Sequence, residues 1–142
     1  MAKLMDNILS AYGDYKELED IRKYVRERAE NFGLSESKVN NITLAVDEAC
    51  SNLIHYNINF DAKKTFNICI VEKTNQFSVV IQDSGKSFNL MRVKCPDMNK
   101  YFKEMKHGGL GIHIIKKIVD KIEYIAATSS NKVNTLTLTM LK

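Results

Sequence analysis

The hydrophobic residues of this chain change their spacing between residues 57 and 66, and no other feature limits the fold as strongly. Before that point, residues 14–33 and 35–57 carry apolar side chains three and four positions apart, which predicts two amphipathic helices. After it, apolar and polar residues alternate over 66–82, which is the period of a half-buried strand. We therefore expect two helices followed by a sheet.

Local signals mark the ends of the two predicted helices. Asp14 and Glu17 have the spacing of a capping box, in which two side chains satisfy free backbone amides at a helix start. Gly33 can adopt the left-handed conformation that ends a helix. Ser35 or Ser37 can supply the oxygen that caps the second helix.

The remaining segments predict two hairpins separated by a loop and a helix. Residues 73–76 have the polar composition of a tight turn between strands, and residues 122–126 and 133–140 alternate as strands do. Residues 108–120 open with glycines and carry isoleucines on two adjoining faces, which predicts a helix buried broadly against the sheet. This order of elements predicts a two-layer α/β sandwich of the α+β class, with its helices on one face.

The composition is that of one soluble globular domain covering residues 1–142, because 44% of the residues are hydrophobic and 27% are charged. The three cysteines are widely spaced and form no Cys-x-x-Cys pair, so we expect neither disulfides nor a zinc site, but a reducing cytoplasm. The N-terminus lacks the apolar core of a signal peptide, and no long apolar run follows. We therefore expect neither secretion nor membrane insertion.

The net charge of +4 is too small to indicate nucleic-acid binding, but its distribution along the chain is uneven. Residues 84–108 hold six basic and two acidic side chains, an excess equal to that of the whole chain. The same residues contain the one proline and no sustained hydrophobic period, which predicts a long functional loop. A basic loop of this kind would attract an anionic partner.

Glu48, Asn52 and His55 lie along one stripe of the second predicted helix, away from its apolar face. A carboxylate one turn from a carboxamide, with an imidazole beyond it, could activate a hydroxyl or water, hold Mg²⁺ through an oxygen and contact a phosphate. The same side chains would also suit a solvated helix face. The stripe alone favours that simpler interpretation.

Two turns that contain glycine follow later in the sequence. Asp83-x-Gly85 closes the first predicted hairpin, where the carboxylate could accept a hydrogen bond from an amine and the glycine could let a flat ligand approach. Gly109-Leu110-Gly111 opens the third helix, whose first backbone amides could face an anion. Each turn is equally typical of an ordinary hairpin exit or helix start, so neither is specific when taken alone.

The order of the three motifs is more specific than any one of them. A Glu-x-x-x-Asn helix, a hairpin, Asp-x-Gly, a long loop and Gly-x-Gly opening a helix resemble the Bergerat ATP-binding fold of gyrase, the heat-shock chaperone, histidine kinases and MutL, the GHKL superfamily. Segments 44–55 and 108–120 are similar to the small anti-sigma regulatory factors, which are bacterial serine-protein kinases. The resemblance covers residues 14–141 and implies a mixed, mostly antiparallel sheet.

This resemblance implies a role for each polar residue of the helix stripe. Glu48 would act as the catalytic base that polarises the attacking serine hydroxyl, and Asn52 would ligate the Mg²⁺ that bridges the ATP phosphates. His55 would lie near those phosphates. Lys106 and His107 adjoin the glycines and are the nearest candidates for contacts with the γ-phosphate.

The two glycine turns would bind the other parts of the nucleotide. Asp83 would accept a hydrogen bond from the adenine amino group, with Gly85 packed under the base. The Gly109-Leu110-Gly111 turn would let the start of the third helix approach the phosphates.

On this resemblance, the chain would be a cytoplasmic serine/threonine protein kinase that uses ATP and Mg²⁺. It would phosphorylate a small STAS-type antagonist of the anti-anti-sigma class, regulate a sigma factor or analogous partner, and form a homodimer. Residues 84–108 would form its ATP lid.

Ser87 stands at a position where a second glycine is common in this family. The alternative function of a catalytically weak, ATP-dependent protein-binding switch therefore stays open. A nucleic-acid-binding loop is the weakest hypothesis, so we expect neither nucleic acid nor a membrane as partner.

Overall fold

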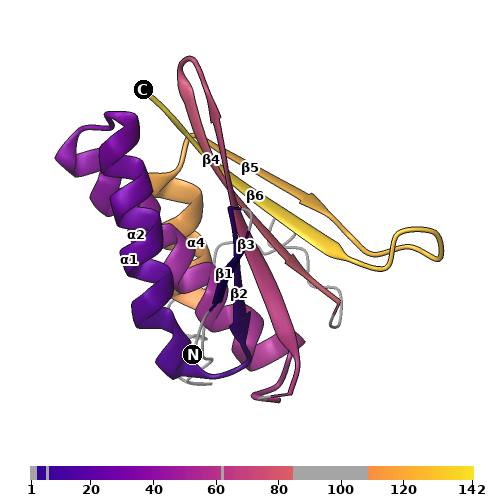
Figure 1. Cartoon of the computed structure of the whole chain (residues 1–142). Helices are drawn as coiled ribbons and strands as arrows, with labels where there is room; N and C mark the ends of the chain where they lie inside the picture. The colour runs from indigo at the N-terminus through magenta and orange to yellow at the C-terminus, as the bar shows by residue number, and fades with distance from the viewer. Residues whose placement is uncertain (1–2, 6, 62, 85–108) are drawn as a thin grey trace, which may run out of the picture.

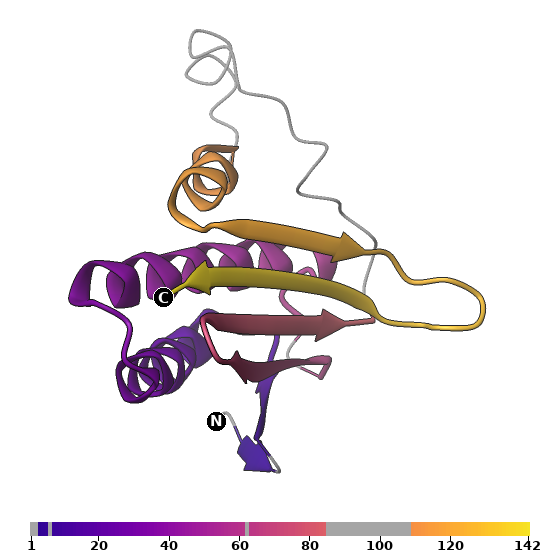
Figure 2. The same ribbon diagram turned by 90° about the horizontal axis from the view of Figure 1, so that it is seen from above.

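The computed structural model describes residues 3–5, 7–61, 63–84 and 109–142, and its helices lie on one face of a sheet (Figures 1 and 2). Its helical elements are α1 (Leu18–Phe32), α2 (Glu36–Asn52), α4 (Gly109–Ile118), the 3-10 turn η1 (Tyr15–Glu17) and the π-helical turn η2 (Leu53–Asn57). The two-layer sandwich predicted from the hydrophobic spacing is confirmed. The predicted loop 84–108 lies outside the described residues, apart from Ser84.

The sheet contains six strands in the order β1-β2-β3-β4-β6-β5. They are β1 (Lys3–Met5), β2 (Ile8–Tyr12), β3 (Thr65–Lys73), β4 (Gln76–Asp83), β5 (Lys121–Ile125) and β6 (Asn134–Leu141). The two predicted hairpins are confirmed as β3–β4 and β5–β6. Within the described residues the sheet is antiparallel throughout rather than mixed.

The N-terminal hairpin of β1 and β2 has no counterpart among the elements predicted from the sequence. Only Leu9 and Ala11 of β2 are buried, while Ile8 and Tyr12 at its two ends are exposed. Five residues with two buried positions are too few for a clear period. Pairing of β2 with β3, which the local sequence does not reveal, is what makes this segment a strand.

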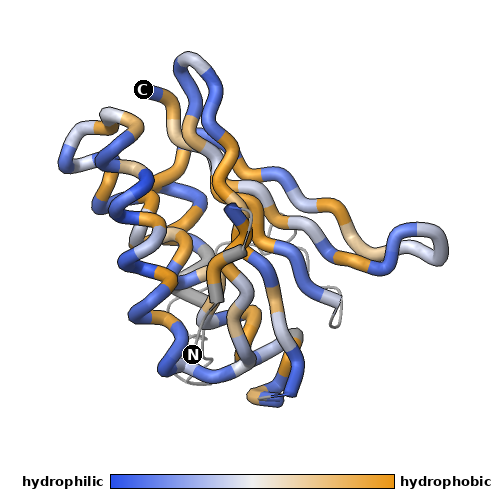
Figure 3. Tube along the Cα trace, viewed as in Figure 1, coloured by the Kyte–Doolittle hydropathy of each residue, from blue (hydrophilic) through white to orange (hydrophobic). Residues whose placement is uncertain are grey.

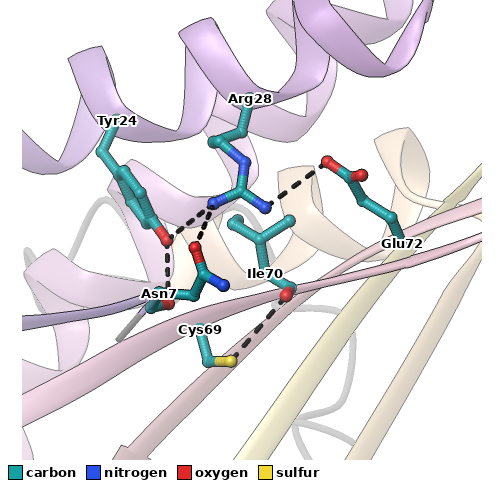
Figure 4. Close-up of polar contacts among 6 residues, drawn as sticks. All are labelled: Asn7, Tyr24, Arg28, Cys69, Ile70 and Glu72. Atoms are coloured by element: carbon teal, nitrogen blue, oxygen red, sulfur yellow. Dashed lines mark hydrogen bonds and ion pairs between the residues drawn. The ribbon is translucent and has the colours of Figure 1, made fainter. Parts of the chain in front are cut away.

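Polar contacts from α1 hold the turn between β1 and β2 (Figure 4). Asn7, in this turn, has a left-handed backbone with a φ of 65°. The Tyr24 hydroxyl donates to the Asn7 carbonyl oxygen at 3.0 Å, and Arg28 Nη1 donates to Asn7 Oδ1 at 3.4 Å. Arg28 Nη2 also lies 3.5 Å from Glu72 Oε1 on β3. Burial raises the pKa of the Tyr24 hydroxyl. The hairpin is thus held to the helix layer by these side chains and to the sheet by its pairing with β3.

The capping box expected before α1 does not close. Asp14 Oδ1 accepts a hydrogen bond from the Lys16 backbone amide at 3.0 Å, so Asp14 caps the turn η1. Glu17, however, is buried and its Oε1 accepts from the Tyr12 backbone amide at 3.3 Å. The Asp14 amide, which the box would pair with Glu17, donates to the Tyr12 carbonyl oxygen at 2.8 Å, while the Glu17 carboxylate binds the end of β2.

The other helix-end signals are confirmed. Gly33 follows α1 with φ 96° and ψ 22°, and its amide bonds back into the last turn of the helix. Of the two candidate serines, Ser35 is the N-cap of α2, with its Oγ 3.3 Å from the Lys38 amide nitrogen. These two residues set the sharp turn that brings α2 back beside α1.

The core lies between the helices and the inner face of the sheet, where the apolar segments face one another (Figure 3). Its largest fully buried side chains are Phe66, Phe77, Ile21, Ile42, Ile54, Ile68, Ile81, Ile115 and Leu138. The helices and strands named from hydrophobic spacing all contribute to it. Among the described residues, no helix has the length and apolar character needed to cross a membrane.

Helix α4 is less buried than its sequence predicts. It packs against α2, and its fully buried side chain in the described part is Ile115. Ile118 is only partly buried, and Ile114 is 37% exposed. Over its described side chains, residues 113–118, α4 is therefore buried along a narrower strip than the two adjoining isoleucine faces predict, because it packs beside α2.

We expect that replacing Gly33 by alanine lowers the free energy of unfolding by about 1–2 kcal/mol, since a Cβ atom disfavours left-handed backbone. Urea unfolding followed by circular dichroism would measure this. Glu30→Ala, at an exposed position of the last turn of α1, is the matched control and should change stability by less than about 0.5 kcal/mol. Equal effects of the two substitutions would contradict the prediction.

Candidate functional site

The candidate site begins where α2 changes from α-helix to π-helix. Glu48 and Asn52 lie on the last two α-helical turns, and His55 lies within η2. The Ile58 amide donates to the Leu53 carbonyl at 2.9 Å, five residues back, as in a π-helix. The wider turn changes the direction in which His55 leaves the helix, so the single stripe predicted for a regular helix applies only as far as Asn52.

Asn52 is a buried polar residue with an unmet hydrogen-bonding atom. Only 6% of it is exposed, and its Nδ2 has no hydrogen-bond partner within the described part of the chain. Leaving a buried donor unpaired costs about 1–3 kcal/mol, so such groups are rare and are often explained by function. The interpretation of the stripe as a solvated helix face is therefore wrong at Asn52.

Glu48 is half-buried one turn before Asn52. Burial raises the pKa of its carboxyl above the usual 4.5, and the negative charge of neighbouring Asp47 raises it further. Asp47 itself pairs with Arg22 of α1 through a contact of 2.7 Å between Oδ1 and Nη1. Glu48 is thus a stronger base than a solvated glutamate.

His55 belongs to a small aromatic cluster that the sequence motifs do not include. Its ring lies edge-on to Tyr56, with 4.3 Å between centroids, and to Phe60, with 5.4 Å. Phe60 also contacts Tyr15 edge-on at 4.9 Å. Asn59 and Phe60 both have left-handed backbones, with φ values of 55° and 58°, which shape the loop after η2. The imidazole is thus packed edge-on against two aromatic rings.

Asp83 is the last residue of β4 and is 6% exposed. It faces Asn134 across the β4–β6 pair, and Asn134 Nδ2 donates to Asp83 Oδ1 at 3.2 Å. Asn134 is only 1% exposed, and its Oδ1 accepts from the Ala127 backbone amide at 2.8 Å. Sequence reasoning missed Asn134. The one available signal is its polarity at an inward position two residues before Leu136.

Helix α4 begins at Gly109, as predicted, so Gly109, Leu110 and Gly111 form its first turn. The helix runs opposite to α2, and Figure 1 shows its N-terminal end on the same side of the molecule as the C-terminal end of α2. The first backbone amides of a helix attract anions. Gly85, Lys106 and His107 lie outside the described residues, so their placement stays a prediction.

The described residues hold no group of three histidine, cysteine or carboxylate side chains that could bind a metal ion together. A structural zinc or calcium site is therefore not found in this part of the chain. Mg²⁺, by contrast, is commonly held by one or two protein oxygens, with phosphates and waters as its other ligands. The Asn52 carboxamide is compatible with a site of that kind.

Curated relatives resemble the chain at low identity. Serine-protein kinase RsbW of Halalkalibacterium halodurans is 26% identical over 107 residues, which are 72% of this chain and 65% of that protein. Serine-protein kinase RsbW of Bacillus subtilis is 23% identical over 99 residues, 66% of this chain and 61% of that protein. The chain thus spans somewhat less than two thirds of the length of these relatives.

Solved structures share the fold. A chain of the SiaB-SiaC complex from Pseudomonas aeruginosa superposes with a TM-score of 0.62 at 13% identity, covering 99% of this chain and 91% of that one. The RsbU and RsbW domains of a Mycobacterium tuberculosis protein give a TM-score of 0.58 at 15% identity, over 94% of this chain and 32% of that one. These likenesses confirm the predicted fold.

Residues 13–140 match the family model described as the histidine kinase-like ATPase domain. The match includes every helix of the described structure, the strands β3 to β5, and β6 except its last residue. It therefore also covers Glu48, Asn52, Asp83 and the start of α4. The chain belongs to the histidine kinase-like ATPase domain family.

Proposed function

We propose that the chain is an ATP-dependent protein kinase that phosphorylates a serine or threonine of a small antagonist protein and so regulates a sigma factor or similar partner. One observation carries the proposal: Glu48, a half-buried carboxylate of raised pKa, lies one turn from Asn52, whose buried amide nitrogen has no partner among the described residues. Neither feature stabilises the fold, and both suit phosphoryl transfer.

The phosphate end of the nucleotide would lie between α2 and the start of α4. Asn52 fits a phosphate-bound Mg²⁺, because its Oδ1 can ligate the ion while its unpaired Nδ2 donates to a phosphate oxygen. The imidazole of His55 and the first amides of α4 would face the same phosphates. Lys106 and His107, just before α4 in the sequence, would contact the γ-phosphate.

The base would bind at the end of β4. Asp83 would accept a hydrogen bond from the adenine amino group, and Gly85 would pack beneath the ring. The following segment, 84–108, would act as the ATP lid, and its excess of basic side chains would offset the charge of the triphosphate. The site would thus extend from the sheet to the two helices.

Glu48 would take the proton of the acceptor hydroxyl as the serine oxygen attacks the γ-phosphorus. A bond forms between that oxygen and phosphorus, the bond from phosphorus to the bridging oxygen breaks, and ADP leaves with the electron pair. Mg²⁺, which Asn52 would hold, would neutralise part of the phosphate charge during this transfer. The raised pKa of Glu48 makes its carboxylate a stronger proton acceptor than a solvated glutamate.

The relatives support this proposal through their names, since the similar proteins of H. halodurans and B. subtilis are each called a serine-protein kinase. We propose the same class of activity for this chain. Its substrate would be a STAS-type antagonist, its second partner a sigma factor or analogous regulator, and its assembly a homodimer.

Replacing Glu48 by glutamine is expected to lower phosphotransfer by about 10²- to 10⁴-fold, the contribution of a general base, while ATP binding is retained. The assay would follow label from γ-labelled ATP into purified STAS-type antagonists from the same genome. Glu36→Gln, at the exposed start of α2, is the matched control and should keep full activity.

Two results of this assay would contradict the proposal. Equal labelling by Glu48→Gln and the unchanged chain would remove Glu48 as the base. Tight ATP binding by the unchanged chain without transfer to any antagonist would favour the ATP-dependent protein-binding switch.

Replacing Asn52 by leucine is expected to abolish Mg²⁺-dependent ATP binding without lowering the free energy of unfolding. The substitution removes a buried donor that has no partner in the described residues, and exchanging such a group for an apolar one of similar size is neutral or stabilising. Isothermal titration and urea unfolding would measure the two effects. A chain that is clearly destabilised by the substitution would show that Asn52 has a structural role.

The phosphotransfer rate is expected to fall as pH decreases through the raised pKa of Glu48, because only the ionised carboxylate accepts a proton. Asp47→Asn removes a negative charge that raises this pKa, so the acid limb of the pH–rate profile should move to lower pH. Measuring kcat/KM against pH for both chains tests this. An unmoved acid limb would mean that Glu48 does not control the rate.

A further inference from the structure

We infer that Asn134 is a positioning residue that fixes the Asp83 carboxylate for recognition of an exocyclic amine, and so sets a preference for 6-amino over 6-oxo purine nucleoside triphosphates. The inference rests on the proposed function in one respect only, that Asp83 receives the nucleobase. It does not depend on phosphoryl transfer.

The contact between the two residues is built into the sheet. Asp83 ends β4 and Asn134 begins β6, and the strand register places them directly opposite each other. Both side chains point to the inner face of the sheet, in line with buried Ile81 and Leu136, and both are at least nine-tenths buried. A hydrogen bond of 3.2 Å joins Asn134 Nδ2 to Asp83 Oδ1.

A second hydrogen bond decides which way the Asn134 amide faces. The Ala127 backbone N–H is a donor and lies 2.8 Å from Oδ1 of Asn134. The backbone N–H must face the oxygen of the Asn134 carboxamide, so the amide nitrogen faces Asp83. Exchanging the oxygen and nitrogen positions would place two donors against each other at Ala127. The amide therefore links the connection between β5 and β6 to the carboxylate at the end of β4.

This fixed carboxylate selects the chemistry of its ligand. A carboxylate only accepts hydrogen bonds, so it can bind the amino group of a 6-aminopurine but meets the oxygen of a 6-oxopurine with repulsion. Such discrimination requires a carboxylate that cannot rotate away, because a mobile side chain could avoid the repulsion and would lose entropy on binding. Asn134 restricts this rotation, because its Nδ2 donates to Oδ1 of Asp83.

The test compares ATP with inosine triphosphate, which has an oxygen in place of the amino group, by titration against three forms of the full chain. The variant is Asn134→Ala. The matched control is Gln82→Ala, which removes a similar cross-strand bond, from Gln82 Nε2 to Thr135 Oγ1 at 3.3 Å, one residue earlier in the same strand pair. Gln82 and Thr135 point to the opposite face of the sheet.

We expect Asn134→Ala to lower the ratio of ATP to inosine triphosphate affinity about tenfold, the loss of one hydrogen bond to a charged group, mainly by weakening ATP. Gln82→Ala should leave this ratio unchanged. If Asn134→Ala is too unstable to titrate, Asn134→Asp keeps the shape and the bond from Ala127 but sets two carboxylates against each other, and should lower the ratio as well.

The inference would be overturned if Asn134→Ala kept the original ratio of ATP to inosine triphosphate affinity. It would also be overturned if the chain without substitutions bound the two nucleotides equally. Failure of the proposed function would look different. A chain that prefers ATP, loses that preference with Asn134→Ala and transfers no phosphate would refute the kinase and leave the role of Asn134 in place.

Discussion

Burial of the apolar face of α2 is the constraint on which the rest of the structure depends. Val39, Ile42 and Val46 are almost completely buried, and α2 contacts α1 on one side, α4 on the other and strand β6 of the sheet. A helix held from three directions cannot rotate about its axis without exposing these side chains. The positions of Glu48 and Asn52 are therefore set by packing far from either residue.

The same packing leaves the candidate site with groups that do not favour folding. The Asn52 amide nitrogen is buried without a partner in the described residues, and Glu48 is half-buried beside Asp47, so that burial and this like charge both raise its pKa. A well-packed core can carry such groups, because the free energy it supplies exceeds the loss at two side chains. The Arg22–Asp47 ion pair limits the accumulation of negative charge there.

How much the sequence reveals depends on how local each determinant is. The helix α2, its cap at Ser35 and the end of β4 at Asp83 follow from spacing and turn residues within a few positions, and these predictions are confirmed. The β1–β2 hairpin and the contact of Asn134 with Asp83 depend on strands that are distant in sequence. Spacing within a single segment contains no information about such pairing.

The π-helical turn η2 separates two parts of one helix that can change independently. Residues up to Asn52 follow regular α-helical geometry, whereas the residues of η2 occupy a turn widened by one residue. Deleting one residue within Leu53–Asn57 would restore α-helical spacing. The residues after the deletion would then rotate about the helix axis, whereas Glu48 and Asn52 would keep their positions. A change in the length of this turn could therefore alter the direction of the imidazole and its aromatic neighbours during evolution, while the preceding helix keeps its packing.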